Sequence, residues 1–222
     1  MNRDILNLFV NYNQSFERLK DLLQDELPRS LRLFNIRLRL AFDIQIDFKG
    51  EISLTKTKEV KKTYVLLIKL MEIWNAYEAL FHYAKDTKKY VNVKESIYKA
   101  YSQTLLNEVG SLTILKNTLD ELKKKYDSNK NFKSDFKQLI KRIEDDDRIR
   151  PNLTESCKSI VEYFEGNKTI SGIEMIALIY AERNMYYHNG ETAKMGMRYG
   201  NRQFLIGTLT TGFYTFTCNK NY

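Results

Sequence analysis

The sequence predicts a mainly α-helical protein: a helical bundle with an N-terminal β-hairpin. Several long segments repeat apolar residues every three to four positions, which is the period of an amphipathic helix. Only two prolines and nine glycines occur among 222 residues, so long uninterrupted elements are expected. Residues 36–48 depart from this period, because they alternate apolar and polar side chains as a strand does.

The N-terminal part contains one expected helix and the expected hairpin. Apolar residues recur at helical spacing through residues 3–25, and Pro28 ends that helix. From Ile36 to Phe48 every even position is apolar, and the odd positions are polar or charged except for Ala41. Residues 49–51 form a plausible turn before the alternation resumes, which predicts a β-hairpin across roughly 36–55. Two strands alone are marginally stable, so the hairpin is expected to pack on the helices or pair with another chain.

The rest of the chain is expected to be helical. Helices are predicted over residues 57–85, 92–125, 132–144, 154–164 and 171–188. Thr154 is a possible N-cap of the fourth, and Thr169 or Ser171 of the fifth. The charge-free segment 203–218 suits a buried strand or a final helix. A helix is favoured there, because the segment must close a helical domain.

Composition and charge restrict the class of protein. The net charge of +8, from 36 basic and 28 acidic residues, favours a polyanionic partner, although many proteins without one are as basic. Cys157 and Cys218 stand outside any CxxC pattern and are expected to be free thiols. No segment is long and apolar enough to cross a bilayer, so a soluble, cytoplasmic protein with no membrane partner is expected.

The sharpest chemical signal is the hexapeptide 183–188, Arg-Asn-Met-Tyr-Tyr-His, which contains one of only two histidines. The helix-stop pair Asn189-Gly190 follows it directly. An arginine binds phosphate through paired N–H donors, and a histidine transfers protons near neutral pH. RNA supplies its own nucleophile, the 2′-OH, so these groups can cleave it without a metal. The sequence has no HExxH and no clustered His or Cys, and no metal or other cofactor is expected.

These residues resemble the HEPN superfamily, small helical domains marked by Arg-x(4–6)-His, often with a polar residue after the arginine. The resemblance covers about residues 57–218. It divides the chain into an N-terminal extension, 1–56, and a HEPN-like helical domain, 57–222. It implies a metal-independent endoribonuclease that works as a homodimer, with two Arg/Asn/His sets in one composite cleft. The family's usual settings, toxin–antitoxin and anti-phage defence systems, imply an antitoxin or regulatory protein as a further partner.

The resemblance also assigns roles to single residues. Arg183 and His188 would carry the chemistry and Asn184 would position the substrate, as in HEPN ribonucleases. Glu78 lies on the apolar side of the expected 57–85 helix and would orient Arg183. The alternative for Glu78 is a place at the edge of that stripe, in solvent or paired within its own helix. Tyr187 could support the site by stacking on a base, although core or dimer-interface packing is more usual for a tyrosine at helical spacing.

Three basic residues after the motif could line the path of the phosphate backbone: Lys194, Arg198 and Arg202. The motif itself raises a geometric question. Arg183 and His188 are five residues apart, about 140° around a regular helix, and do not share a face. Their side chains can converge if the helix frays at its end or if two copies meet across a two-fold axis.

Three other hypotheses for the function of the motif and of the chain remain open. Arg183 and His188 could be structural, with the arginine bridging helices and the histidine capping the last carbonyls. The chain could also be a non-catalytic RNA- or nucleotide-binding module. A third possibility is a helical interaction protein whose hairpin adds a strand to a partner's sheet.

Overall fold

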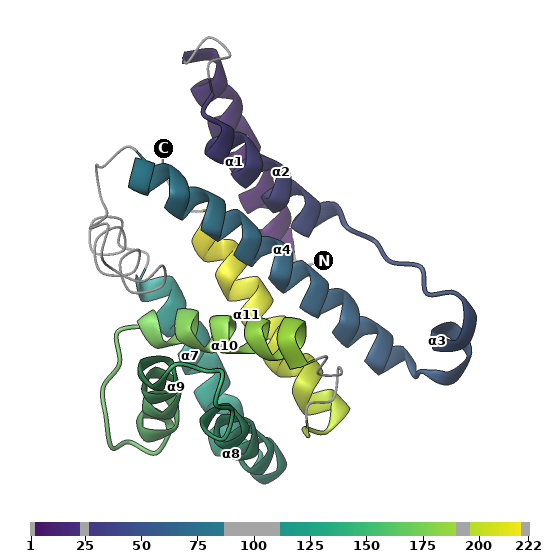
Figure 1. Ribbon diagram of the computed structural model, residues 1–222, viewed down its shortest axis with the longest axis vertical. Coiled ribbons are helices and arrows are strands. Elements are labelled where there is room, and N and C mark those ends of the chain that lie inside the picture. Colours follow the sequence, from purple (N-terminus) through teal and green to yellow (C-terminus); the bar gives the residue numbers. More distant parts are fainter. Residues whose placement is uncertain (1–2, 23–26, 87–111, 190–195, 219–222) are drawn as a thin grey trace.

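The computed structural model describes residues 3–22, 27–86, 112–189 and 196–218, and within these ranges every regular element is a helix (Figure 1). The mainly α-helical class predicted from the sequence is confirmed. In chain order the helices are α1 (Arg3–Leu22), α2 (Arg29–Asp43), α3 (Gly50–Thr55), α4 (Lys58–Asp86), α7 (Leu112–Ser128), α8 (Lys130–Glu144), α9 (Pro151–Phe164), α10 (Ile173–Asn189) and α11 (Tyr199–Cys218).

The long helix α4 organises one half of the molecule. α2 and α11 pack along it, and α1 packs against α11 (Figure 1). Because α4 has neighbours on more than one side, its buried residues are not confined to one stripe; Leu70, Ile73, Trp74 and Tyr77 are all almost completely buried. The end of α2 is fastened to α4 by a hydrogen bond of 2.8 Å from Lys69 Nζ to the Phe42 carbonyl.

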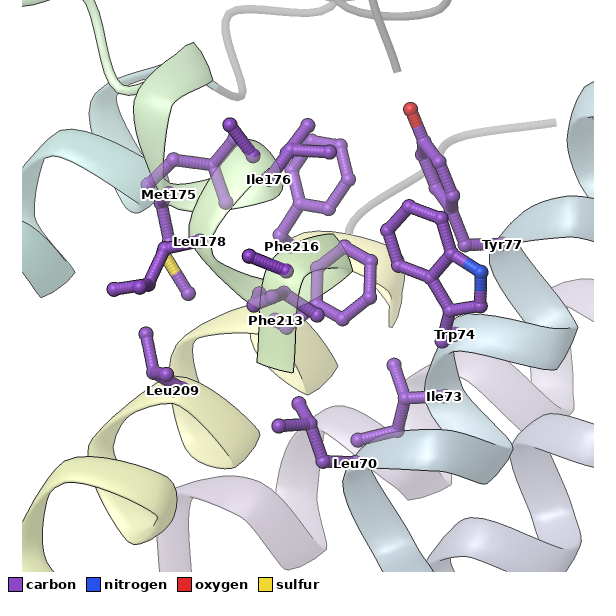
Figure 2. Packing of buried hydrophobic residues seen from close by; sticks show 14 of the residues in the cluster. Leu70, Ile73, Trp74, Tyr77, Met175, Ile176, Leu178, Leu209, Phe213 and Phe216 are labelled. Carbon is purple, nitrogen blue, oxygen red and sulfur yellow. The ribbon is translucent and has the colours of Figure 1, made fainter. Parts of the chain in front are cut away.

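The other half consists of α7, α8, α9 and α10. α8 packs on α7 and α9, α9 packs on α10, and α11 contacts both α7 and α4, so α11 connects the halves. Figure 2 shows the core at this junction, where residues of α10 and α11 meet Trp74 and Tyr77 of α4. The ring of Trp74 stacks on Phe213 with centroids 6.0 Å apart, and Phe213 stacks on Phe216 at 5.8 Å. α10, which carries the hexapeptide, joins this core through Tyr180, whose ring stacks on Trp74.

The predicted β-hairpin across residues 36–55 is wrong. α2 extends to Asp43, and residues 50–55 form α3. Phe34 and Leu38 are four residues apart, share one face of α2 and are buried. Ile36 and Leu40 are also four apart, but they lie on the opposite face and stay exposed. Two apolar helix faces therefore produced the even-numbered pattern up to Phe42, and residues 44–48 lie in the connection between α2 and α3. The hypothesis that the hairpin adds a strand to a partner's sheet loses its basis.

The expected helices in the rest of the chain are mostly confirmed. α4, α8 and α10 lie within about two residues of their predicted limits, and residues 203–218 lie in α11. Of the helix predicted over 92–125, the part up to residue 111 lies outside the described residues. α9 begins at Pro151, so Thr154 is inside the helix and is not its N-cap. The Ser171 hydroxyl accepts a hydrogen bond of 3.4 Å from the Ile173 amide at the start of α10.

Candidate functional site

The helix α10 brings the hexapeptide from the core to the surface. After Glu174 in its first turn the helix is apolar on all sides up to Ala181, and residues 175–179 are completely buried. The side chains of Arg183 and Asn184 are half-buried near its C-terminal end. The guanidinium Nη1 of Arg183 donates a hydrogen bond of 3.1 Å to the amide oxygen of Asn184. The first two residues of the hexapeptide are therefore held together by a direct contact.

Arg183 and Asn184 line a cleft of about 530 Å³. The connection between α8 and α9 also lines this cleft and contributes Arg148 and Arg150. The complete lining, with the acidic and apolar members, is Asp146, Arg148, Ile149, Arg150, Leu153, Tyr180, Arg183 and Asn184. Three guanidinium groups and one carboxylate thus surround one cleft, which gives it a positive balance and makes it suited to a phosphate group.

The arginines of the α8–α9 connection are held in different ways. Arg148 donates from Nε and Nη2 to the two carboxylate oxygens of Asp146, at 2.8 and 3.1 Å, while its side chain stays 60% exposed. Arg150 is exposed and immediately precedes Pro151, the first residue of α9. Because the N-terminus of a helix carries a partial positive charge, it adds to the attraction for an anion in this cleft.

Aromatic rings lie beneath Arg183. Its guanidinium carbon is 6.0 Å from the centroid of the Tyr180 ring, and that ring stacks on Trp74 with centroids 5.1 Å apart. The indole Nε1 of Trp74 donates a hydrogen bond of 2.8 Å to Glu78 Oε1. Among the described contacts Glu78 is engaged by Trp74 of its own helix, so the expectation that it orients Arg183 directly is corrected. One chain of contacts leads from Glu78 through Trp74 and the Tyr180 ring to Arg183.

Arg202, one of the three basic residues predicted to line the path of the phosphate backbone, is in the interior of the protein. Its guanidinium and the carboxylate of Glu182 are completely buried and form two hydrogen bonds of 2.5 Å. A buried guanidinium that already pairs with a carboxylate cannot also contact a polyanion at the surface, so an RNA-binding role for Arg202 is wrong. The pair instead joins α11 to α10, at the residue directly before Arg183.

Arg198 and Lys194 complete that predicted path. Arg198 has an exposed side chain whose Nη1 lies 2.7 Å from Asp135 Oδ1, and its backbone amide donates to Oδ2 of the same carboxylate. It is held at the start of α11 and does not line the cleft of Arg183. Lys194 lies outside the described residues.

The position of His188 follows from the backbone of α10, which is helical through Asn189. Residue 188 is therefore about 140° around the helix from Arg183, and it shares a face with Asn184. The side chains of Tyr187 and His188 lie outside what the structure describes. Because the helix does not end before His188, fraying does not bring residues 183 and 188 to one face of a single chain.

Sequence reasoning missed Arg148 and Arg150, which precede Arg183 by more than thirty residues. A weak signal was present in Arg148-Ile149-Arg150-Pro151, where an arginine pair stands directly before a proline that begins a helix. It also missed Glu182 as the buried partner of Arg202, although a glutamate within an apolar helix requires a partner.

Comparison of the chain with protein-family models, curated proteins and solved structures gave no match. Over the described residues, no three His, Cys, Asp or Glu side chains are close enough together to hold a metal ion. None of the helices in the described ranges is long and apolar enough to span a membrane.

Proposed function

We propose that the chain is a metal-independent endoribonuclease of the HEPN type, which acts on RNA phosphodiesters through a dimeric site of Arg183, Asn184 and His188. One observation carries the proposal: Arg183 and Asn184 share a positively charged cleft with Arg148 and Arg150. The hexapeptide is thus part of a surface that suits a phosphate group. A purely structural role for Arg183 would not need further arginines in the same cleft.

Each group has a definite part in the reaction. The 2′-oxygen attacks the neighbouring phosphorus, the bond to the 5′-oxygen breaks, and the 2′-proton has to leave as the 5′-oxygen gains one. The guanidinium of Arg183 stabilises the negative charge that accumulates on the phosphate oxygens. The imidazole of His188 transfers the protons, because this side chain can both accept and donate near neutral pH. Asn184 positions the phosphate through its amide N–H groups.

A second copy of the chain is part of the proposal. Since α10 stays helical through Asn189, residues 183 and 188 of one chain are on different faces. A two-fold axis near the end of α10 can bring Arg183 of one protomer to His188 of the other. The resemblance to HEPN domains supports this arrangement, and with it a toxin or anti-phage defence effector that acts on RNA in the cytoplasm under control of an antitoxin or regulatory protein.

A second candidate function is a non-catalytic RNA- or nucleotide-binding module. The same cleft favours it, because its lining includes groups that bind nucleotides without a reaction: guanidiniums, an amide and the Tyr180 ring. On this alternative, Arg183 and Arg150 hold a phosphate, and His188 does not take part in a reaction.

The test is cleavage of a labelled single-stranded RNA and a tRNA pool in EDTA, measured with the binding of the same RNAs. Arg183→Ala or His188→Ala is expected to reduce the cleavage rate by about a hundredfold or more. Arg150→Gln is expected to weaken binding and to lower the slope of log affinity against log salt by about 0.7, the value for one lost contact to a single strand. Arg18→Gln, at an exposed arginine of α1, is the matched control and is expected to change neither quantity.

The outcomes separate the two functions. Cleavage by the wild type that both alanine variants lose supports the nuclease. Binding that depends on Arg183 and Arg150, with no cleavage by any variant, supports the binding module. RNA that is neither bound nor cleaved by a folded wild-type protein contradicts both.

A further inference from the structure

The outer side of α2 exposes apolar residues that the core does not use. Leu33, Ile36 and Leu40 are 40%, 58% and 38% exposed, respectively. At 100° per residue they fall within a sector of about 60°, and together they form what we call the α2 face. In the described part of the chain, the other exposed large apolar residues are Val10, Leu54 and Tyr199, which lie on different helices. Single exposed apolar residues are ordinary, but a stripe of three on one helix indicates a partner.

The fold of one chain does not explain this stripe. α2 packs on α4 through its opposite side, where Leu31, Phe34, Leu38 and Ala41 are buried. α2 lies at the edge of the molecule in Figure 1, alongside α4. The helix is therefore apolar on two sides, and only one of them contributes to the core. This second apolar side also contributes to the alternation of apolar and polar residues that predicted a β-strand from the sequence.

The charges along the α2 face are ordered. Arg29 and Arg32 are exposed in the first turn of α2, and Asp43 is exposed at its last residue. All three lie over the stripe or along the same edge of it. The other two arginines of the helix are paired within the chain: Arg37 with Glu72 at 3.0 Å, and Arg39 with Glu17 at 3.1 Å. One end of the face is thus positive and the other end is negative.

We propose that the α2 face binds a second copy of itself, with the two α2 helices antiparallel and a two-fold axis near Ile36. Arg29 and Asp43 are each seven residues from Ile36, about 10.5 Å along the helix on either side. A two-fold axis at Ile36 therefore places Arg29 level with the partner subunit's Asp43, and Arg32 one turn from it. Leu33 meets the partner's Leu40 at the same time. The face is complementary to itself in charge and in apolar contact, as an isologous interface must be.

The size of the face sets the expected strength. A helix of 15 residues is about 22 Å long, and an interface made by one such helix is smaller than the roughly 800 Å² per partner of standard complexes. The association is therefore expected in the micromolar range, where it varies with protein concentration. The arrangement is independent of the pairing proposed at the end of α10, because α2 and α10 lie in different halves of the molecule (Figure 1).

Sedimentation equilibrium over a range of protein concentrations tests the proposal. The wild-type mass is expected to rise with concentration, and Ile36→Asp is expected to weaken the association at least tenfold, so that its mass rises only at correspondingly higher concentrations. Leu54→Asp is the matched control: it also places an acid at an exposed leucine, but outside the α2 face, and it is expected to associate like the wild type. Equal masses for wild type and Ile36→Asp at every concentration would overturn the proposal.

A charge swap tests the antiparallel register. The test uses an Arg32→Gln background, which leaves one ionic pair, between Arg29 and the partner's Asp43, on each side of the axis. In this background Arg29→Glu alone, or Asp43→Lys alone, places two like charges opposite each other and should weaken the association severalfold. The two substitutions together restore opposite charges and should recover the affinity of the background protein. Helical circular dichroism verifies folding in each case. A combined variant that associates no better than the single ones would contradict this register.

Discussion

The completely buried ion pair between Glu182 and Arg202 allows a quantitative prediction about stability. Replacing Glu182 with Gln removes the carboxylate that pairs with the completely buried Arg202 guanidinium. Removing one partner of a buried pair costs about 3–5 kcal/mol. That is a large share of the 5–15 kcal/mol by which a folded domain is usually stable. The variant is therefore expected to fold, but to unfold at much lower denaturant concentration.

The magnitude can be tested by urea unfolding followed by far-ultraviolet circular dichroism. With a slope of about 2–3 kcal/mol per molar urea, the midpoint should fall by about 1–2.5 M. Replacing both partners by apolar residues, Glu182→Met with Arg202→Met, should cost much less than either single change, because no charge is then left buried. Additive losses, or a single-variant loss below about 1 kcal/mol, would refute the reasoning that desolvation dominates this pair.

Two further predictions concern other buried contacts. Burial raises the pKa of the Cys157 thiol, so as the pH rises this thiol ionises in the unfolded chain before it does so in the folded protein. The resulting contribution to the free energy of unfolding is full below pH 9, and about 1.4 kcal/mol of it is lost by pH 10. Cys157→Ala in a reducing buffer should therefore show a smaller fall in stability than the wild type between pH 8 and 10, and equal falls would contradict this. Gly212→Ala should cost about 1–3 kcal/mol, because the added Cβ would clash with the Thr118 side chain. Gly200→Ala, with open space around it on the same helix, is the control, and equal thermal midpoints for the two would refute the clash.

Sequence periodicity predicted most of the helices for a clear physical reason. α8 buries one stripe that includes Phe132, Phe136, Leu139 and Ile143, and such a stripe is visible in the sequence. α2 misled the same reasoning, because its exposed side is apolar as well. Periodicity reports which residues avoid water, but it does not report whether the core or another molecule covers them.

The candidate site was predictable only in part. Arg183 and Asn184 could be found because they belong to one short motif. Arg148 and Arg150 reach the same cleft from the α8–α9 connection, and only the packing of α9 on α10 brings them there. Arg202 looked like a surface cation, because its sequence neighbours do not reveal that Glu182 of another helix is its partner.

The most direct test of the central proposal is a mixture of two inactive variants. Arg183→Ala and His188→Ala are each expected to lack cleavage activity in EDTA. If Arg183 of one protomer works with His188 of the other, exchanged dimers of the two variants contain one intact site. An equal mixture should then regain about a quarter of the wild-type rate at the same total protein concentration, since half of the dimers are mixed and each has one site of two. An active wild type with no recovery in a mixture shown to contain mixed dimers would contradict the shared site.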